Sequence, residues 1–136
     1  APAFSLVANN MQPITLDDSA GKARVIAAVV SLDTGVCDTE SKRLNEIAKE
    51  LPDVEVLVVS KDLPFAQRRW CGANGVENVK TASDYRDDST FGADYGILVK
   101  ETRLLARSVF VIDGSNTVQY SQVVPDLLDE PDYDAV

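Results

Sequence analysis

The sequence predicts an α/β protein, and three consecutive segments carry the prediction. The apolar run at residues 25–30 is typical of a buried strand. Apolar side chains at helical spacing then predict a helix from about residue 36 to 51, ending before Pro52: Leu44, Ile47, Ala48 and Leu51. Residues 54–60 predict a second, mostly apolar strand. A strand, helix and strand in succession are typical of a βαβ unit with parallel neighbouring strands.

The segments around this unit are assigned in chain order. Residues 4–7 and 14–16 flank a turn and predict a short hairpin, after which the first central strand is expected at residues 23–31. Residues 62–71 predict a second helix, with Asp62 as its cap, Pro64 in its first turn, and Gly72 or Gly75 available to end it.

The last third of the chain predicts mostly β-structure. A short strand is expected at residues 78–82 and one or two helical turns at 89–95. Strong β-runs at 105–113 and 117–124 are joined by Asp113-Gly114, which is a hairpin signal and predicts antiparallel strands.

Size and composition limit the possible functions. The chain has 136 residues, which fits a single domain over residues 1–136. Its net charge of -9 disfavours nucleic acid and anionic membranes as partners, and no apolar run is long enough to span a membrane. No signal peptide is visible at the start, so we expect a soluble, cytoplasmic protein.

The absence of histidine excludes Ser/His and Cys/His hydrolases and imidazole metal sites, and we expect neither a metal nor a cofactor.

The two cysteines are the candidates for chemistry. Cys37 is predicted at the start of the first helix, where unpaired N–H groups and the helix dipole favour a thiolate. The hydroxyl of Thr34 can cap that helix or hydrogen-bond the sulfur. Cys71 lies 34 residues after Cys37, which excludes a Cys-x-x-Cys mechanism. A structural disulfide, worth about 4 kcal/mol for such a loop, and burial as small apolar groups are the alternatives to redox chemistry.

Arg107 is a candidate partner for a thiolate. It interrupts an otherwise apolar predicted strand, and a buried guanidinium requires an anionic partner. The thiolate of Cys37 is one such partner, and a carboxylate such as Asp113 or Asp33 is the alternative.

Three separated motifs resemble the bacterial thiol peroxidases, which are atypical two-cysteine peroxiredoxins. The motifs are Ser31-Leu-Asp-Thr-Gly-Val-Cys37, Asp62-Leu-Pro-Phe-Ala-Gln67 with Trp70-Cys-Gly72, and Leu105-Ala-Arg-Ser-Val-Phe-Val-Ile-Asp113. The resemblance covers nearly the whole chain and implies a thioredoxin-like fold with a central mixed sheet flanked by helices.

The resemblance also implies the roles of individual residues. Cys37 would be the peroxidatic nucleophile, Thr34 and Arg107 would complete its pocket, and Cys71 would resolve the intermediate through an intramolecular disulfide. It further implies a homodimer and recycling by thioredoxin. We therefore expect a thiol-dependent peroxidase that reduces hydrogen peroxide and organic hydroperoxides.

Departures from the family pattern support a second hypothesis. Val30 occupies the position of the usual motif proline, and the resemblance implies a chain shortened at both ends relative to the family. The alternative is accordingly a non-catalytic binding or scaffold domain with a silenced peroxidase site. A disulfide exchange catalyst is less favoured, because the chain lacks a Cys-x-x-Cys pair.

Overall fold

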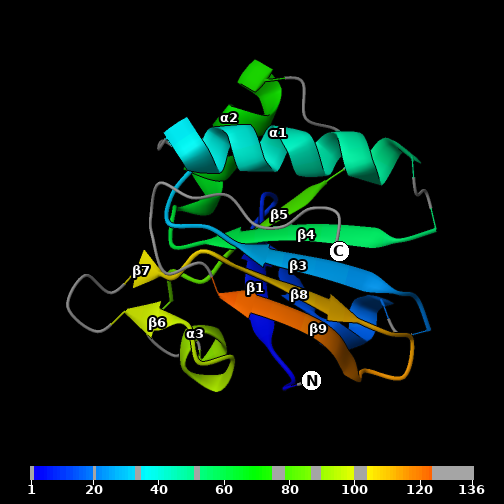
Figure 1. Ribbon diagram of the computed structural model, residues 1–136. Coiled ribbons are helices and arrows are strands. Elements are labelled where there is room, and N and C mark those ends of the chain that lie inside the picture. Colours follow the sequence, from blue (N-terminus) through cyan, green and yellow to red (C-terminus); the bar gives the residue numbers. More distant parts are fainter. Residues whose placement is uncertain are drawn as a thin grey trace.

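The computed structural model describes residues 2–19, 21–32, 35–50, 53–74, 79–86, 90–99 and 104–123, with backbone alone for residues 19, 35–41, 73 and 74. In these ranges a seven-stranded mixed sheet has the order β2-β1-β5-β4-β3-β8-β9 (Figure 1). The predicted boundaries at residues 51, 78, 89 and 124 lie outside the described residues.

The predicted βαβ unit forms the centre of the sheet. Strands β3 (Arg24–Ala28) and β4 (Glu55–Ser60) are parallel neighbours, and helix α1 (Gly35–Glu50) connects them. All five residues of β3 are buried, and successive residues pack into clusters on opposite faces. The ladder ends at Ala28, so β3 is shorter than the strand predicted over residues 23–31.

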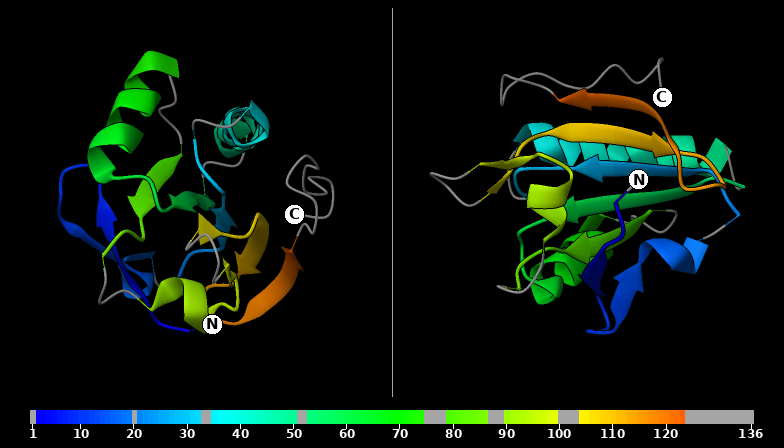
Figure 2. Two further views of the ribbon diagram at one scale, coloured as in Figure 1. Left: turned by 90° about the vertical axis from the view of Figure 1, so that its left-hand side faces the viewer. Right: turned by 90° about the horizontal axis from the view of Figure 1, so that it is seen from below.

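Helices cover the two faces of the sheet unequally. Helices α1 and α2 (Pro64–Asn74) lie on one face, and the short helix α3 (Phe91–Asp94) lies on the other (Figure 2). Helix α2 begins two residues later than predicted and runs through Gly72, so Gly72 does not end it. Gly75, the alternative, lies outside the described residues. The backbone N–H of Gln67 donates to the carbonyl oxygen of Leu63 at 3.1 Å, which makes Leu63 the N-cap and Asp62 the residue before it.

Strands on both sides of the centre complete the sheet. Strand β5 (Lys80–Ser83) runs parallel to β4, and the predicted N-terminal hairpin is confirmed as β1 (Ser5–Ala8) and β2 (Pro13–Thr15). Leu16 does not extend β2, because it begins the 3₁₀ helix η1 (Leu16–Ser19).

The predicted C-terminal hairpin is also confirmed. Strands β8 (Ser108–Ile112) and β9 (Val118–Val123) pair in antiparallel fashion. In the turn that joins them, Asn116 adopts a φ of 64°, a left-handed conformation that asparagine tolerates better than most residues.

The single strand predicted over residues 105–113 is wrong. The chain instead forms β7 (Leu104–Leu105), which pairs with β6 (Leu98–Val99) in a separate small sheet, before β8 begins. The backbone N–H of Ala106 donates to the carbonyl of Ile97 at 2.7 Å, so the chain leaves one ladder just before it enters the other. Arg107 therefore lies between two strands, at a point where the chain changes sheets.

Aromatic rings pack together under the α3 face of the sheet. Phe91 lies 5.5 Å from Phe4 and 4.6 Å from Tyr95 between ring centroids, and Tyr95 lies 5.2 Å from Phe110. The hydroxyl of Tyr95 donates to the carbonyl oxygen of Pro2 at 2.8 Å, and burial raises the pKa of Tyr95 to about 12. This cluster fixes α3 and the start of the chain against the sheet.

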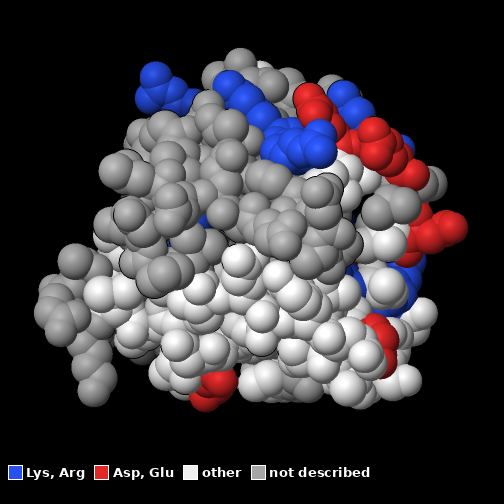
Figure 3. All heavy atoms as spheres, viewed as in Figure 1, with Lys and Arg blue, Asp and Glu red and all other residues white. Residues whose placement is uncertain are grey.

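The exposed side chains of α1 are polar over residues 42–50, the part of this helix whose side chains the structure describes. In the view of Figure 3, side chains of both signs lie over this helix, and an exposed pair joins Arg43 to Glu46 at 3.4 Å. No helix among the described residues combines the length and apolar character that a membrane crossing requires.

Candidate active site

The start of α1 lies at the carboxyl end of β3. This helix begins at Gly35, so the backbone of Cys37 is in its first turn, as the sequence predicts. The first turn of a helix presents unpaired N–H groups that favour an anion. Thr34 lies outside the described residues, and so does the side chain of Cys37, so the roles assigned to both stay predictions.

Arg107 reaches the same edge of the sheet from a distant part of the sequence. Strand β8 runs antiparallel to β3 with Ala28 opposite Ser108, so Arg107 lies level with Val29, where the chain leaves β3 toward α1. The side chain of Arg107 is 1% exposed, which makes it one of the largest fully buried side chains described. A buried cation and the start of α1 therefore share one edge of the sheet.

The alternative pairing of Arg107 with Asp113 is wrong. The whole of β8 separates the two residues, which corresponds to about 20 Å of extended chain. The carboxylate of Asp113 instead accepts hydrogen bonds at the far end of β8, from the backbone N–H groups of Ser115 and Thr117 and from Gln119. Asp33, the other carboxylate considered, lies outside the described residues.

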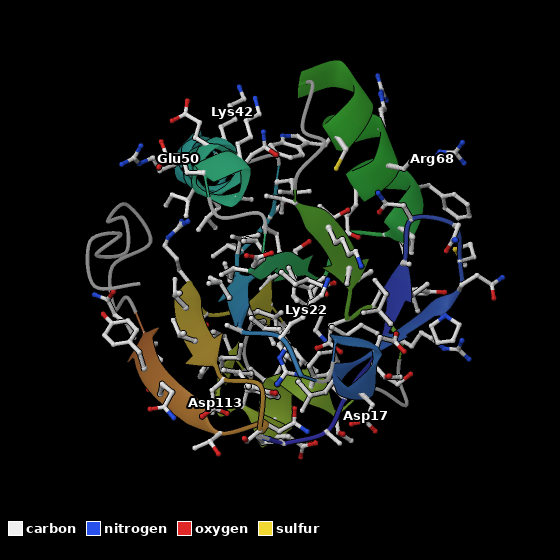
Figure 4. All side chains as sticks on the ribbon, turned by 90° about the vertical axis from the view of Figure 1, so that its right-hand side faces the viewer. Asp17, Lys22, Lys42, Glu50, Arg68 and Asp113 are labelled. Carbon is white, nitrogen blue, oxygen red and sulfur yellow. The ribbon has the colours of Figure 1, made fainter. Side chains whose placement is uncertain are left out.

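A second buried arginine occupies the opposite end of the same strands. Arg24 is 2% exposed, and its guanidinium donates to the carbonyl oxygens of Leu16 at 3.0 Å and Asp113 at 2.5 Å and to Oδ1 of Asn116 at 2.6 Å. Figure 4 looks onto this end of the sheet, with Asp113 labelled. Because its partners belong to η1 and the β8–β9 turn, Arg24 has a structural role.

Cys71 lies in α2, one turn before its last residue, and is a half-buried free thiol. Its sulfur is 3.7 Å from Oγ1 of Thr81, whose hydroxyl donates to Oδ1 of Asn9 at 2.8 Å. Since a hydroxyl has one hydrogen, the thiol of Cys71 is the donor to Thr81. This hydrogen bond joins the thiol of Cys71 in α2 to Thr81 in β5.

Asp62 has a role that sequence reasoning missed. The expectation that it caps α2 is wrong, because its carboxylate faces the segment that precedes α1. Oδ1 accepts from the Ser31 hydroxyl at 2.7 Å, and Oδ2 accepts from the Leu32 N–H at 2.9 Å and from the Ser60 hydroxyl at 2.8 Å. One signal for this role was available in the sequence. Ser31 follows β3 and Ser60 is the last residue of β4, and these two strands are parallel neighbours.

A metal site is not formed by the described side chains. Among them, no group of three or more His, Cys, Asp and Glu residues is placed to hold a metal ion. The chemistry that the described residues offer is that of a thiol, a buried guanidinium and a helix N-terminus.

Comparison with known proteins identifies the family. The Redoxin family model matches residues 1–136. Thiol peroxidase from Halalkalibacterium halodurans is 53% identical over 134 residues, covering 98% of this chain and 80% of the relative. Thiol peroxidase from Bacillus subtilis is 48% identical over the same shares of the two chains.

Solved structures agree with the sequence comparison. The peroxiredoxin-like protein from Aquifex aeolicus superposes with a TM-score of 0.92 at 42% identity, covering 99% of this chain and 80% of that chain. Thiol peroxidase from Chromobacterium violaceum has a TM-score of 0.91 at 22% identity over 99% of this chain and 79% of that one, which supports the fold alone. The expected thioredoxin-like fold with a mixed sheet flanked by helices is confirmed, and the chain belongs to the Redoxin family.

Proposed function

We propose that this chain is a thiol-dependent peroxidase in which Cys37 attacks the hydroperoxide and Cys71 resolves the oxidised intermediate. The peroxidase activity is supported by relatives named thiol peroxidases that are about half identical to this chain, and the silenced-scaffold alternative is not favoured. The observation that carries the residue assignment is the delivery of buried Arg107 to the edge of the sheet at which α1 begins.

The first chemical step oxidises Cys37. Its thiolate attacks one peroxide oxygen, an S–O bond forms and the O–O bond breaks, and the departing hydroxide or alkoxide takes up a proton. The sulfur becomes a sulfenic acid and the peroxide is reduced to water or an alcohol. Hydrogen peroxide and organic hydroperoxides share the O–O bond and are both substrates in this proposal.

The second step forms a disulfide. The sulfur of Cys71 attacks the sulfenic sulfur of Cys37, an S–S bond forms, and the S–O bond breaks with release of water. Two electrons from an external dithiol then return both residues to thiols. We assign this role to thioredoxin and propose that the protein works in the cytoplasm as a homodimer.

Arg107 and the start of α1 both favour negative charge. A guanidinium stays protonated in proteins, and its burial strengthens its attraction for a thiolate and for the charge that develops on the leaving oxygen. The hydroxyl of Thr34 supplies a hydrogen bond to the sulfur or to the peroxide in this scheme.

The proposal is tested by peroxide consumption with dithiothreitol or thioredoxin as reductant. We expect Cys37→Ser to abolish turnover, and Cys71→Ser to abolish the thioredoxin-coupled reaction while leaving one oxidation of Cys37. Arg107→Lys keeps the charge but loses the planar fork of donors, and we expect a loss of about tenfold or more in the rate of Cys37 oxidation.

Arg24→Lys is the matched control, because Arg24 is a buried arginine at the other end of β3. It should lower stability while leaving the rate of the folded protein unchanged. Equal activity of wild type and Cys37→Ser would reject the proposal, and an Arg107→Lys variant as fast as Arg24→Lys would reject the role of Arg107.

A further inference from the structure

We propose that Asp62 is a positioning residue for the peroxidase reaction, because it fixes the segment from which α1 and Cys37 follow. The inference rests on the proposed role of Cys37. Neither substrate chemistry nor helix capping, the roles that the sequence predicts for the motif residues, accounts for the three hydrogen bonds that the carboxylate of Asp62 accepts.

The hydrogen bonds of Asp62 join two neighbouring strands beyond their carboxyl ends. Ser31 and Leu32 donate from the segment after β3, whereas Ser60 donates from the last residue of β4. The ladder of β3 ends at Ala28, and the N–H of Val29 still donates to the carbonyl of Val59 at 2.8 Å. Beyond Val29, the carboxylate of Asp62 ties Ser31 and Leu32 to Ser60 of β4.

The position of Leu32 limits where α1 can start. Gly35, the first residue of α1, is three residues after Leu32, so a displacement of Leu32 is passed on to the first turn. Cys37 lies in that turn. A shift of about 1 Å in a reacting group can cost on the order of a hundredfold in rate, since the nucleophile must align with the bond that it breaks.

Asp62 is itself held by a buried network. Gln67, 1% exposed, donates from Nε2 to Oγ of Ser60 at 3.0 Å and to the carbonyl oxygen of Ala82 at 2.8 Å. The hydroxyl of Ser83 donates to the carbonyl oxygen of Asp62 at 2.5 Å. The carboxylate is thus anchored to β4, β5 and α2 and can transmit their rigidity to the segment before α1.

The negative charge of Asp62 distinguishes a positioning role of this residue from a purely electrostatic role. A carboxylate near the site opposes formation of the Cys37 thiolate, so removing its charge would favour the thiolate if Asp62 acted through its field alone. Asp62→Asn would then react faster. A positioning role predicts the opposite, because asparagine cannot accept all three hydrogen bonds with the same geometry.

The experiment compares Asp62→Asn, Ser31→Ala and Asp113→Asn in a Cys71→Ser background. Asp113→Asn is the matched control, since that carboxylate also accepts three hydrogen bonds. It lies at the end of β8 that is away from the start of α1. The second-order rate of Cys37 oxidation by hydrogen peroxide is followed by quenched-flow mass spectrometry. Thiolate absorbance as a function of pH and the melting temperature are measured on the same samples.

We expect Asp62→Asn to slow Cys37 oxidation about tenfold or more at a pH where the thiolate is fully formed, and Ser31→Ala to slow it severalfold. Asp113→Asn should match the parent. An unchanged or faster rate in folded Asp62→Asn would overturn the inference, and if that variant does not fold, an unchanged rate in Ser31→Ala would do the same. If Cys37 of the parent does not react with peroxide, the proposed function itself fails, and the inference fails with it.

Discussion

Replacing Phe91 by alanine should remove a large share of the stability of this fold. Phe91 is 1% exposed, and its ring contacts those of Phe4 and Tyr95 in the cluster on the α3 face. Truncation of a buried phenylalanine costs about 3 to 5 kcal/mol, because apolar burial is lost and a cavity remains. This compares with a total stability of about 5 to 15 kcal/mol for an ordinary domain.

The expected change in melting temperature follows from the size of the chain. An unfolding entropy of about 2.1 cal/mol/K per residue corresponds to about 0.29 kcal/mol/K for 136 residues. A loss of about 4 kcal/mol therefore lowers the melting temperature by about 14 °C. Phe91→Leu keeps most of the apolar volume but loses the ring contacts, so it should cost about 1 to 2 kcal/mol.

Urea denaturation and thermal melting of Phe91→Ala and Phe65→Ala provide the measurement. Phe65 is the matched control, because it lies in the first turn of α2 and its side chain is 66% exposed. Phe65→Ala should change the free energy of unfolding by less than about 0.5 kcal/mol. Equal losses in the two variants, or a loss below about 1 kcal/mol in Phe91→Ala, would refute the assignment of Phe91 to the core.

Two further predictions concern hydrogen bonds away from the core. Hydrogen bonds from the backbone of Thr117, the side chain of Gln119 and the backbone of Ser115 hold the pKa of Asp113 below its ordinary value of 3.8. The ionised carboxylate of Asp113 therefore stabilises the fold above pH 3.8, and this stabilisation is lost as the pH falls through the folded-state pKa. Urea titrations should show that the difference in unfolding free energy between wild type and Asp113→Asn narrows below pH 3.8. Thr81→Val removes the acceptor of the Cys71 thiol, so alkylation of Cys71 in a Cys37→Ser background should quicken about twofold to fivefold, and an unchanged rate would contradict the assigned hydrogen bond.

The elements of the central unit were predictable because their signals are local. Burial on both faces requires a nearly continuous apolar run, which marks β3 and β4 in the sequence, and the apolar stripe of α1 repeats at helical spacing. The hairpin of β8 and β9 was similarly marked by its turn residues. The interruption between β7 and β8 at Ala106 was not predictable. It is caused by a hydrogen bond from Ala106 to Ile97, which the apolar pattern of the sequence does not show.

The sequence by itself determined the family, through three spaced motifs, and the order of strands and helices that carry them. Tertiary structure alone decided that Arg107 lies level with the carboxyl end of β3 and which groups Asp62 holds. Local periodicity reports which face of an element is apolar, whereas partners of buried polar groups depend on strand order and register, which bring residues far apart in sequence to one edge of the sheet. The register of β8 against β3 accordingly brings Arg107 to the edge at which α1 begins.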